Sequence, residues 1–326
     1  MSSETPAPAS ATTEPSQPAR PVKCSTQQLE TLPGTAKAGS KYVVLEYLHG
    51  WGRDVLDDDV FGPELAAKMR AHLKAHGAGL QLVRKPGRAG QHRQERYLYV
   101  AFTGDGETPP AMRRLKVSGP EDVLSVDLSS PDTVGGEDVT HPLLLVCTHG
   151  KRDMCCALRG RPLAASLQAC FYGDEVWESS HTKGHRFAPS LILLPWGYSF
   201  GRMNSSAALD MLKAASRGEM FVPGNRGRGC FDRPGQVAEI AVANELFLAG
   251  ECPGIGVLAV RADVDPAPAV GQLGDNEQLR RVIHPDGRSW DVVISAADTE
   301  PVAASCGAQP KPQVMYSAQR IVAVDA

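Results

Sequence analysis

The spacing of two cysteines and two histidines constrains this sequence more than any other feature. Eight residues separate Cys147 from Cys156, and three separate His181 from His185. Thiolate sulfur binds zinc, copper(I) and iron–sulfur clusters, and imidazole nitrogen binds zinc, iron and copper. If the four side chains converge in space, the chain folds around a metal ion or an iron–sulfur cluster.

The width of the cysteine loop bears on the kind of centre. Structural zinc sites usually take their cysteines from a tight turn with about two to four intervening residues, whereas a wider loop is better able to wrap a two-iron cluster. A Rieske centre needs two Cys-x-His steps, and Cys147-Thr148-His149 supplies only one of them. Tetrahedral zinc and a [2Fe–2S] cluster with two histidines on one iron both remain open from the spacing alone.

Two neighbouring cysteines compete for the second thiolate position. Cys155 and Cys156 would point in opposite directions on an extended chain, so only one of them faces the site. His149 is a further alternative ligand. Each residue also has a structural interpretation, because cysteine is often buried without any metal. The combination of four residues, more than any one of them, indicates a metal centre.

The elements around these residues follow an order that is typical of a thioredoxin-like unit. The pattern predicts a buried strand over 143–147, a charged loop, and a helix over 162–170 with proline in its first turn. A short strand over 175–178, a hairpin over 190–203 and a helix over 205–215 complete a thioredoxin-like domain over residues 141–217.

The rest of the chain is predicted to form three further regions. Residues 1–20 are rich in Pro, Ala, Ser and Thr and are expected to be disordered. Residues 21–140 alternate strand and helix patterns and form an N-terminal α/β region. Residues 218–326 form a C-terminal α+β extension, with a hairpin turn at Pro285-Asp286-Gly287. The predicted fold class is therefore α/β.

Two further segments of the N-terminal region carry local signals. The pattern favours a strand over 123–128, and the Pro/Gly/Asp-rich residues 131–138 are typical of a linker.

Composition excludes several classes of protein. A net charge of −3 gives no broad positive field for nucleic acid, and no apolar run reaches the length of a membrane span. The N-terminus lacks an apolar stretch, so a cytoplasmic location is expected, and the eight cysteines then favour metal or redox chemistry over disulfides. No dinucleotide-binding glycine motif follows a strand, so electrons would come from a partner protein.

Two segments resemble the sucrase/ferredoxin-like family. They are CTHGKRDMCCALRGRP, from Cys147 to Pro162, and VWESSHTKGHRFA, from Val176 to Ala188. Weaker similarity runs from about Cys24 to Ala249. The resemblance implies a thioredoxin-like ferredoxin with a bis-histidinyl [2Fe–2S] cluster.

Carried over by position, the resemblance implies that Cys147, Cys156, His181 and His185 are the cluster ligands. Cys156 is favoured over Cys155 because the family places its second cysteine after an Arg-Asp-x-x step. Lys183 replaces a glycine that the family often has between its histidines, and it would place a positive charge near the cluster. The expected groups around the ligands are Arg152, Asp153, Lys183 and Arg186.

The sequence therefore predicts a [2Fe–2S] electron-transfer protein in which electron and proton transfer are coupled through the histidines. One alternative is a cluster-dependent reductase, for instance of ferric siderophores, with Arg152, Lys183 and Arg186 attracting an anion. Another is a zinc-stabilised structural module. Thioredoxin-type thiol exchange lacks its Cys-x-x-Cys, and no carboxylate pair supports glycoside hydrolysis.

Overall fold

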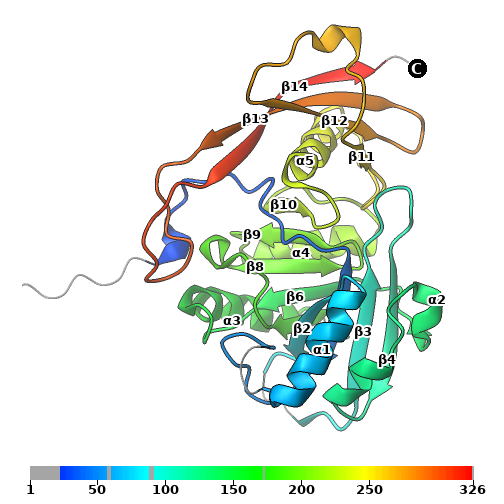
Figure 1. Ribbon diagram of the computed structural model, residues 1–326, viewed down its shortest axis with the longest axis vertical. Helices are drawn as coiled ribbons and strands as arrows, with labels where there is room; N and C mark the ends of the chain where they lie inside the picture. Colours follow the sequence, from blue (N-terminus) through cyan, green and yellow to red (C-terminus); the bar gives the residue numbers. More distant parts are fainter. Residues whose placement is uncertain (1–22, 57–59, 88–91, 172, 325–326) are drawn as a thin grey trace, which may run out of the picture.

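The computed structural model describes residues 23–56, 60–87, 92–171 and 173–324, and its α/β architecture confirms the predicted fold class. One mixed sheet of ten strands forms the centre, and a second sheet of four strands lies at the C-terminal end (Figure 1). The tail 1–20, predicted to be disordered, lies outside the described residues. The thioredoxin-like arrangement of the central unit stays a prediction.

The strands of the large sheet follow the order β10-β9-β8-β6-β7-β2-β1-β3-β4-β5. Their bounds are β1 Lys41–Glu46, β2 Gly79–Arg84, β3 Arg96–Phe102, β4 Ala111–Val117, β5 Glu137–Asp138, β6 Leu143–Cys147, β7 Val176–Ser179, β8 Ser190–Leu194, β9 Tyr198–Gly201 and β10 Asn225–Arg228.

Two pairs of neighbouring strands are parallel. Helix α1 (Pro63–Ala75) connects β1 with β2, and helix α3 (Met154–Gln168) connects β6 with β7. Each unit is a strand–helix–strand crossover, so the carboxyl ends of its two strands open at the same edge of the sheet. For β6 and β7, that edge receives the cysteine and histidine loops.

Backbone pairing joins the N-terminal and central parts of the chain. Strand β2 pairs antiparallel with β7, where Val83 lies opposite Ser179 and Arg84 opposite Glu178. Strand β10 likewise pairs with β9. The large sheet is therefore continuous across both predicted boundaries, at residues 140 and 217, and the domain division stays a prediction.

Strand β6 is buried on both faces. Leu144 and Val146 belong to a core with side chains of α3, α4 (Ser205–Ser216) and α5 (Arg233–Leu248). Leu145 belongs to a second core with side chains of β1, β3 and β8. Burial on both faces explains why this strand is a continuous apolar run instead of an alternating pattern.

Helix α3 begins eight residues earlier than the sequence predicts. Asp153 caps it, accepting a hydrogen bond from the backbone N–H of Cys155 at 2.8 Å, and Pro162 lies inside the helix instead of in its first turn. Proline removes one hydrogen bond to the carbonyl four residues before it, that of Leu158. Leu158 is 53% exposed, so water can solvate that part of the helix. The start of α3 is therefore marked by the capping residue Asp153 and not by Pro162.

Residues 120–138 also differ from expectation. The predicted strand over 123–128 is a 3-10 turn, η3 (Pro120–Ser125), and the predicted linker contains helix α2 (Pro131–Val134) as well as β5. Ser130 caps α2 by accepting a hydrogen bond from the backbone N–H of Thr133. A proline just after a capping residue favours a helical start in both places.

The C-terminal part packs on helix α5. Its sheet has the order β11-β12-β13-β14, and its side chains share a core with α5. Its strands are β11 Ala259–Arg261, β12 Glu277–Ile283, β13 Ser289–Asp298 and β14 Val314–Val324. The predicted hairpin turn at residues 285–287 is confirmed, since β12 and β13 pair across it.

The connection between β13 and β14 runs back to the N-terminal end of the described chain. Figure 1 shows this segment beside the 3-10 turn η1 (Cys24–Thr26). The backbone N–H of Ala303 donates a hydrogen bond of 2.8 Å to Oε1 of Gln27. Two chain segments that are almost 280 residues apart in sequence thus meet next to the central unit.

Within the described residues, none of the helices combines the length and apolar character that a membrane span requires.

Candidate metal centre

Two of the predicted ligands face each other between β6 and α3. Cys147 is the last residue of β6, Cys156 lies in the first turn of α3, and both are fully buried. Their thiols are within hydrogen-bonding reach, and the interaction with Cys156 holds the pKa of Cys147 well below its usual range. The imidazole of His181 acts on the Cys147 pKa in the same direction. The loop between the two cysteines is therefore closed by their side chains.

Gly160 sets the distance between helix α3 and strand β6. A Cβ atom at this position would lie 2.0 Å from the carbonyl oxygen of Cys147, which is far inside van der Waals contact. Gly160 is one helical turn after Cys156, so the close approach brings that turn directly against the end of β6. In the sequence CCALRG, Cys156 supplies the thiol and Gly160 allows helix α3 to pack closely against β6.

The two predicted histidine ligands lie on the loop that follows β7. The rings of His181 and His185 are stacked, with centroids 5.1 Å apart and planes 26° from parallel. Nδ1 of each ring is buried and has no hydrogen-bond partner among the described residues. Burial lowers the pKa of His185, which favours the neutral imidazole that can bind a metal. Both rings therefore offer an unused donor atom.

Arg226 holds this histidine loop in place. Its guanidinium is buried, donating to the carbonyl oxygen of Lys183 at 3.2 Å and to Oγ of Ser190 at 3.2 Å. Burial lowers the pKa of Arg226 to about 9. Gly184 must lack a side chain, because a Cβ there would lie 2.4 Å from Nη1 of Arg226. The positioning role of Arg226 was not predicted, since the arginine comes from β10, far along the chain.

Both ring nitrogens of His149 already have hydrogen-bond partners. Its Nδ1 accepts from the backbone N–H of His181 at 3.1 Å, and its Nε2 lies 2.6 Å from the carbonyl oxygen of Gly52. Neither ring nitrogen is left for a metal. His149 instead connects the histidine loop to the N-terminal region.

The four other predicted site residues have different surroundings. Arg186 is paired with Glu30 through two hydrogen bonds of 2.6 and 2.8 Å. Lys183 is exposed and has a left-handed backbone conformation, with φ of 53°. Arg152 is partly exposed, and its backbone N–H bonds to the carbonyl oxygen of His149. Asp153, besides capping α3, belongs to a second group of cysteines.

This second group could hold a metal ion and was not predicted. The ligand atoms of Cys24, Asp153, Cys155 and Cys306 all lie within 4.8 Å of one another. Burial and the charge of Asp153 raise the pKa of Cys24, and burial raises that of Cys306. No local spacing could have revealed the group, because its members come from three distant parts of the chain.

The four predicted ligands are not part of this second group. Within the described part of the chain, the second group alone has three or more ligand atoms that are all within 4.8 Å of one another. Cys147 lies within hydrogen-bonding reach of Cys156 and His181, and the ring of His185 stacks on that of His181.

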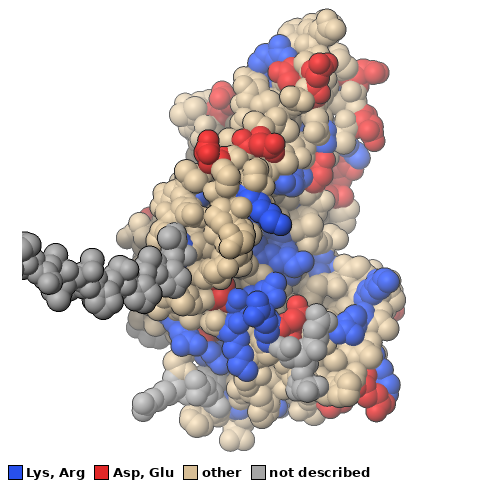
Figure 2. Space-filling model, turned by 60° about the vertical axis from the view of Figure 1, so that its left-hand side comes forward, with Lys and Arg blue, Asp and Glu red and all other residues tan. Residues whose placement is uncertain are grey.

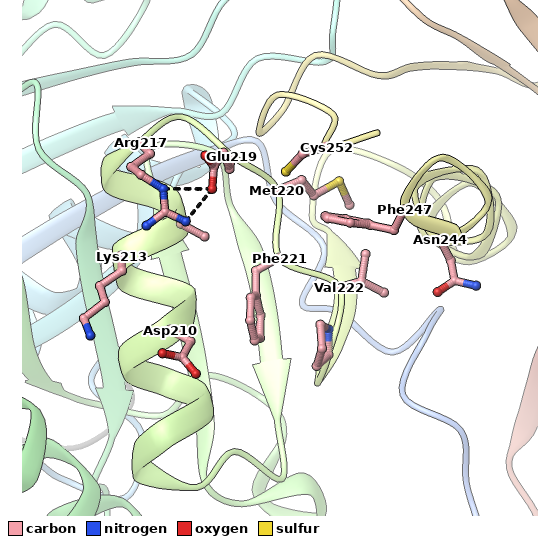
Figure 3. Close-up of a pocket in the computed structure, with 12 residues that line it drawn as sticks. Asp210, Lys213, Arg217, Glu219, Met220, Phe221, Val222, Asn244, Phe247 and Cys252 are labelled. Atoms are coloured by element: carbon pink, nitrogen blue, oxygen red, sulfur yellow. Dashed lines mark hydrogen bonds and ion pairs between the residues drawn. The ribbon is translucent and has the colours of Figure 1, made fainter. Parts of the chain in front are cut away.

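A pocket of about 740 Å³ lies elsewhere, along α4 and α5 (Figure 3). Its walls are mainly apolar, with Phe221 and Phe247 among them, and an ion pair joins Arg217 to Glu219. None of the residues of either group lines this pocket. The candidate metal centre is therefore separate from this pocket.

Residues 32–227 match the family model described as Sucrase/ferredoxin-like. The match includes the four predicted ligands together with Asp153 and Cys155, and it excludes Cys24 and Cys306. No curated protein and no solved structure matches the chain.

Proposed function

Because the chain belongs to the sucrase/ferredoxin-like family, we propose that it is an electron-transfer protein with a [2Fe–2S] cluster held by Cys147, Cys156, His181 and His185. The supporting observation is the pair of buried Nδ1 atoms without partners, which lie on the same sheet edge as two buried thiols. In this proposal residues 141–217 are a thioredoxin-like ferredoxin unit.

The protein side chains determine how the cluster behaves. When bound, a [2Fe–2S] cluster accepts and returns one electron, and neutral imidazoles in place of anionic thiolates raise its reduction potential. With Nδ1 used for binding, Nε2 of each histidine is the atom that holds a proton. The backbone of Ala304 is within hydrogen-bonding reach of His185, and His149 fixes the backbone of His181. These contacts position the two histidines, and burial keeps water from their Nδ1 atoms.

The Nε2 protons predict a potential that depends on pH. Above the pKa of an oxidised-state imidazole, reduction takes up a proton together with the electron, because the added electron raises the affinity of Nε2 for its proton. The potential should therefore fall with rising pH above neutrality, by up to about 59 mV per pH unit for one proton. A spectroscopic redox titration at several pH values between about 6 and 10 measures this change of the reduction potential.

A histidine-to-cysteine variant provides the matched test. His185→Cys should keep a cluster, lower its potential and reduce the pH dependence, because a thiolate ligand carries a negative charge and no Nε2 proton. His284→Cys, in the turn between β12 and β13, makes the same chemical change away from the ligands and should leave the potential unchanged. A potential that is constant across the pH range in the unmodified protein would contradict proton coupling through the histidines.

The redox partner is proposed to be another protein with an acidic surface. Figure 2 shows Lys and Arg side chains gathered across the middle of one face of the molecule. Lys151 lies on the loop between the two proposed cysteine ligands, Lys183 lies between the two proposed histidine ligands, and both side chains are exposed. Complementary charge increases the rate at which two proteins meet.

All eight cysteines are free thiols in the structure, which is in keeping with the cytoplasmic location that we propose.

The reductase alternative has weaker support. It requires Arg152, Lys183 and Arg186 to attract an anionic ferric chelate, and the charge of Arg186 is already neutralised by Glu30. We therefore favour the electron carrier. Single-turnover oxidation of the reduced protein by ferric chelates separates the two functions, because an electron carrier should react no faster than an unrelated ferredoxin of similar potential.

A further inference from the structure

Three cysteines and one aspartate come together beside the proposed cluster from three parts of the chain. Cys24 lies in η1, Asp153 and Cys155 lie at the start of α3, and Cys306 lies between β13 and β14. Sγ of Cys306 is 3.3 Å from Sγ of Cys155 and 3.6 Å from Sγ of Cys24. The carboxylate of Asp153 completes the group, with Oδ1 3.3 Å from Sγ of Cys306 and 3.6 Å from Sγ of Cys24.

These separations are close to the edges of a zinc tetrahedron. Zinc binds cysteine sulfur at about 2.3 Å and carboxylate oxygen at about 2.0 Å. In a tetrahedron with these radii, two sulfurs lie about 3.8 Å apart, and a sulfur lies about 3.5 Å from the oxygen. With Oδ1 of Asp153 as the oxygen ligand, the four shortest distances are 3.3, 3.3, 3.6 and 3.6 Å, within a few tenths of an ångström of these values, and the other pairs lie within 4.8 Å.

We propose that Cys24, Asp153, Cys155 and Cys306 bind a structural Zn²⁺ ion, separate from the proposed [2Fe–2S] cluster. The protein supplies all four ligands, and no position is left for water or substrate, which is the arrangement of structural zinc sites. Cys155, which does not serve the cluster in our proposal, thereby acquires a function.

The charge of such a site is moderated by its surroundings. Three thiolates and a carboxylate carry more negative charge than Zn²⁺ neutralises. The positive end of α3 is adjacent, since Asp153 caps the helix and Cys155 lies in its first turn. The backbone N–H groups of Cys155 and Cys306 also donate to Asp153, each at 2.8 Å. These donors orient the carboxylate and offset part of the excess charge.

Other groups fit this arrangement less well. A four-iron cluster places each ligand on a different iron and spaces the ligands farther apart than the ligands of one ion. A disulfide between Cys155 and Cys306 would use only two of the thiols and would leave Cys24 and Asp153 buried together without a partner ion. Zinc uses all four side chains.

The proposed ion would connect the two ends of the chain to the central unit. It would tie η1 and the segment 299–313 to α3, and this segment brings the backbone of Ala304 to His185. Cys24 and Cys306 lie outside the residues that match the family model, so the site extends beyond the matched segment. Zinc binding would therefore stabilise the C-terminal connection and fix one side of the proposed cluster site.

Metal analysis of the full-length protein tests the proposal. The protein, expressed without added zinc and purified without chelators, should contain about one zinc ion per chain, independent of its iron content. Cys24→Ser and Cys306→Ser should each lose the zinc, retain the iron and unfold at a lower temperature. Cys170→Ser, at an exposed cysteine outside the group, should retain both metals. Cys147→Ser should retain zinc and lose iron, so failure of this proposal and failure of the proposed cluster are distinguishable.

Several results would overturn the zinc site. They are a zinc content near zero, full zinc retention in both Cys24→Ser and Cys306→Ser, or a Cys155–Cys306 disulfide in peptides from the freshly purified, unreduced protein. If a variant does not fold, the zinc X-ray absorption spectrum of the unmodified protein tests the proposed ligand set instead. Three sulfurs at about 2.3 Å and one oxygen at about 2.0 Å are expected, and a shell of nitrogen or of four sulfurs would contradict the assignment.

Discussion

Replacing Cys147 with serine is expected to remove the iron from this protein together with its visible absorption. Cys147 is fully buried at the end of β6, and its thiol faces Cys156. A serine hydroxyl is a hard oxygen donor with a far higher pKa than a thiol, so it replaces a thiolate on iron poorly. Cys156→Ser should have the same effect, because each cysteine is half of the proposed thiolate set.

Cys155→Ser is the matched control for this experiment. Cys155 is the immediate neighbour of Cys156 and is equally buried, and its thiol lies with Cys24 and Cys306 instead of Cys147. Its replacement should leave iron and visible absorption in place and remove only zinc. Iron per chain, the visible spectrum and far-ultraviolet circular dichroism should be measured on all three variants. A Cys147→Ser protein with its full iron content would exclude Cys147 as a ligand.

Replacing Arg228 with methionine is expected to destabilise the protein by about 3–5 kcal/mol. Nη2 of Arg228 lies 2.7 Å from Oε1 of Glu239, and both side chains are completely buried. The hydroxyl of Tyr198 also donates to Oε1 of Glu239, at 2.6 Å. Without Arg228, the carboxylate of Glu239 would be buried without a countercharge between β10 and α5. The free energy of unfolding from urea titration measures the effect.

The pH dependence of this effect has a defined sign. Burial raises the pKa of Glu239, and loss of Arg228 would raise it further. The folded variant then binds a proton that the unfolded chain releases, so its stability falls as pH rises above the unfolded-state pKa of glutamate. The destabilisation should therefore be larger at pH 8 than at pH 5.

Two further variants complete the comparison. Arg228→Met/Glu239→Gln should recover much of the lost stability, because glutamine is neutral and still accepts a hydrogen bond from Tyr198. Arg288→Met removes one partner of the exposed pair with Glu251 and should change stability little. Equal effects of Arg228→Met and Arg288→Met would contradict the importance assigned to the buried pair.

The sequence predicted well those elements that have a local cause. Buried strands such as β6 are continuous apolar runs, and α4 matches the helix predicted over 205–215. The hairpin turn at residues 285–287 carries its own turn residues. In each case, the residues that determine the structure are neighbours in the sequence.

Elements whose signals compete locally were predicted less well. Pro162 was interpreted as a helix start, although Asp153 caps the helix nine residues earlier. Strand β4 was not predicted, because Arg113, Arg114 and Lys116 interrupt its apolar pattern. Its arginines are paired across the sheet with Asp138 and Glu137, a context that only the folded chain provides.

The candidate sites show the same difference between residues with a local sequence signal and residues that meet only in the folded chain. Cys147, Cys156, His181 and His185 were selected by short spacings and by resemblance, and the structure brings their loops to one sheet edge, although their role as ligands stays a prediction. The roles of Cys24 and Cys306 could not be predicted, because 282 positions separate these residues and they meet only when the C-terminal connection folds back. Arg226 was missed for the same physical reason.

The visible and electron paramagnetic resonance spectra of the freshly purified protein test the central claim most directly. We expect visible absorption bands that dithionite bleaches, and a reduced-state resonance signal that integrates to about one unpaired electron per two irons, since a [2Fe–2S] cluster accepts one electron. A colourless protein that contains zinc and no iron, and gives no signal after reduction, would contradict the claim.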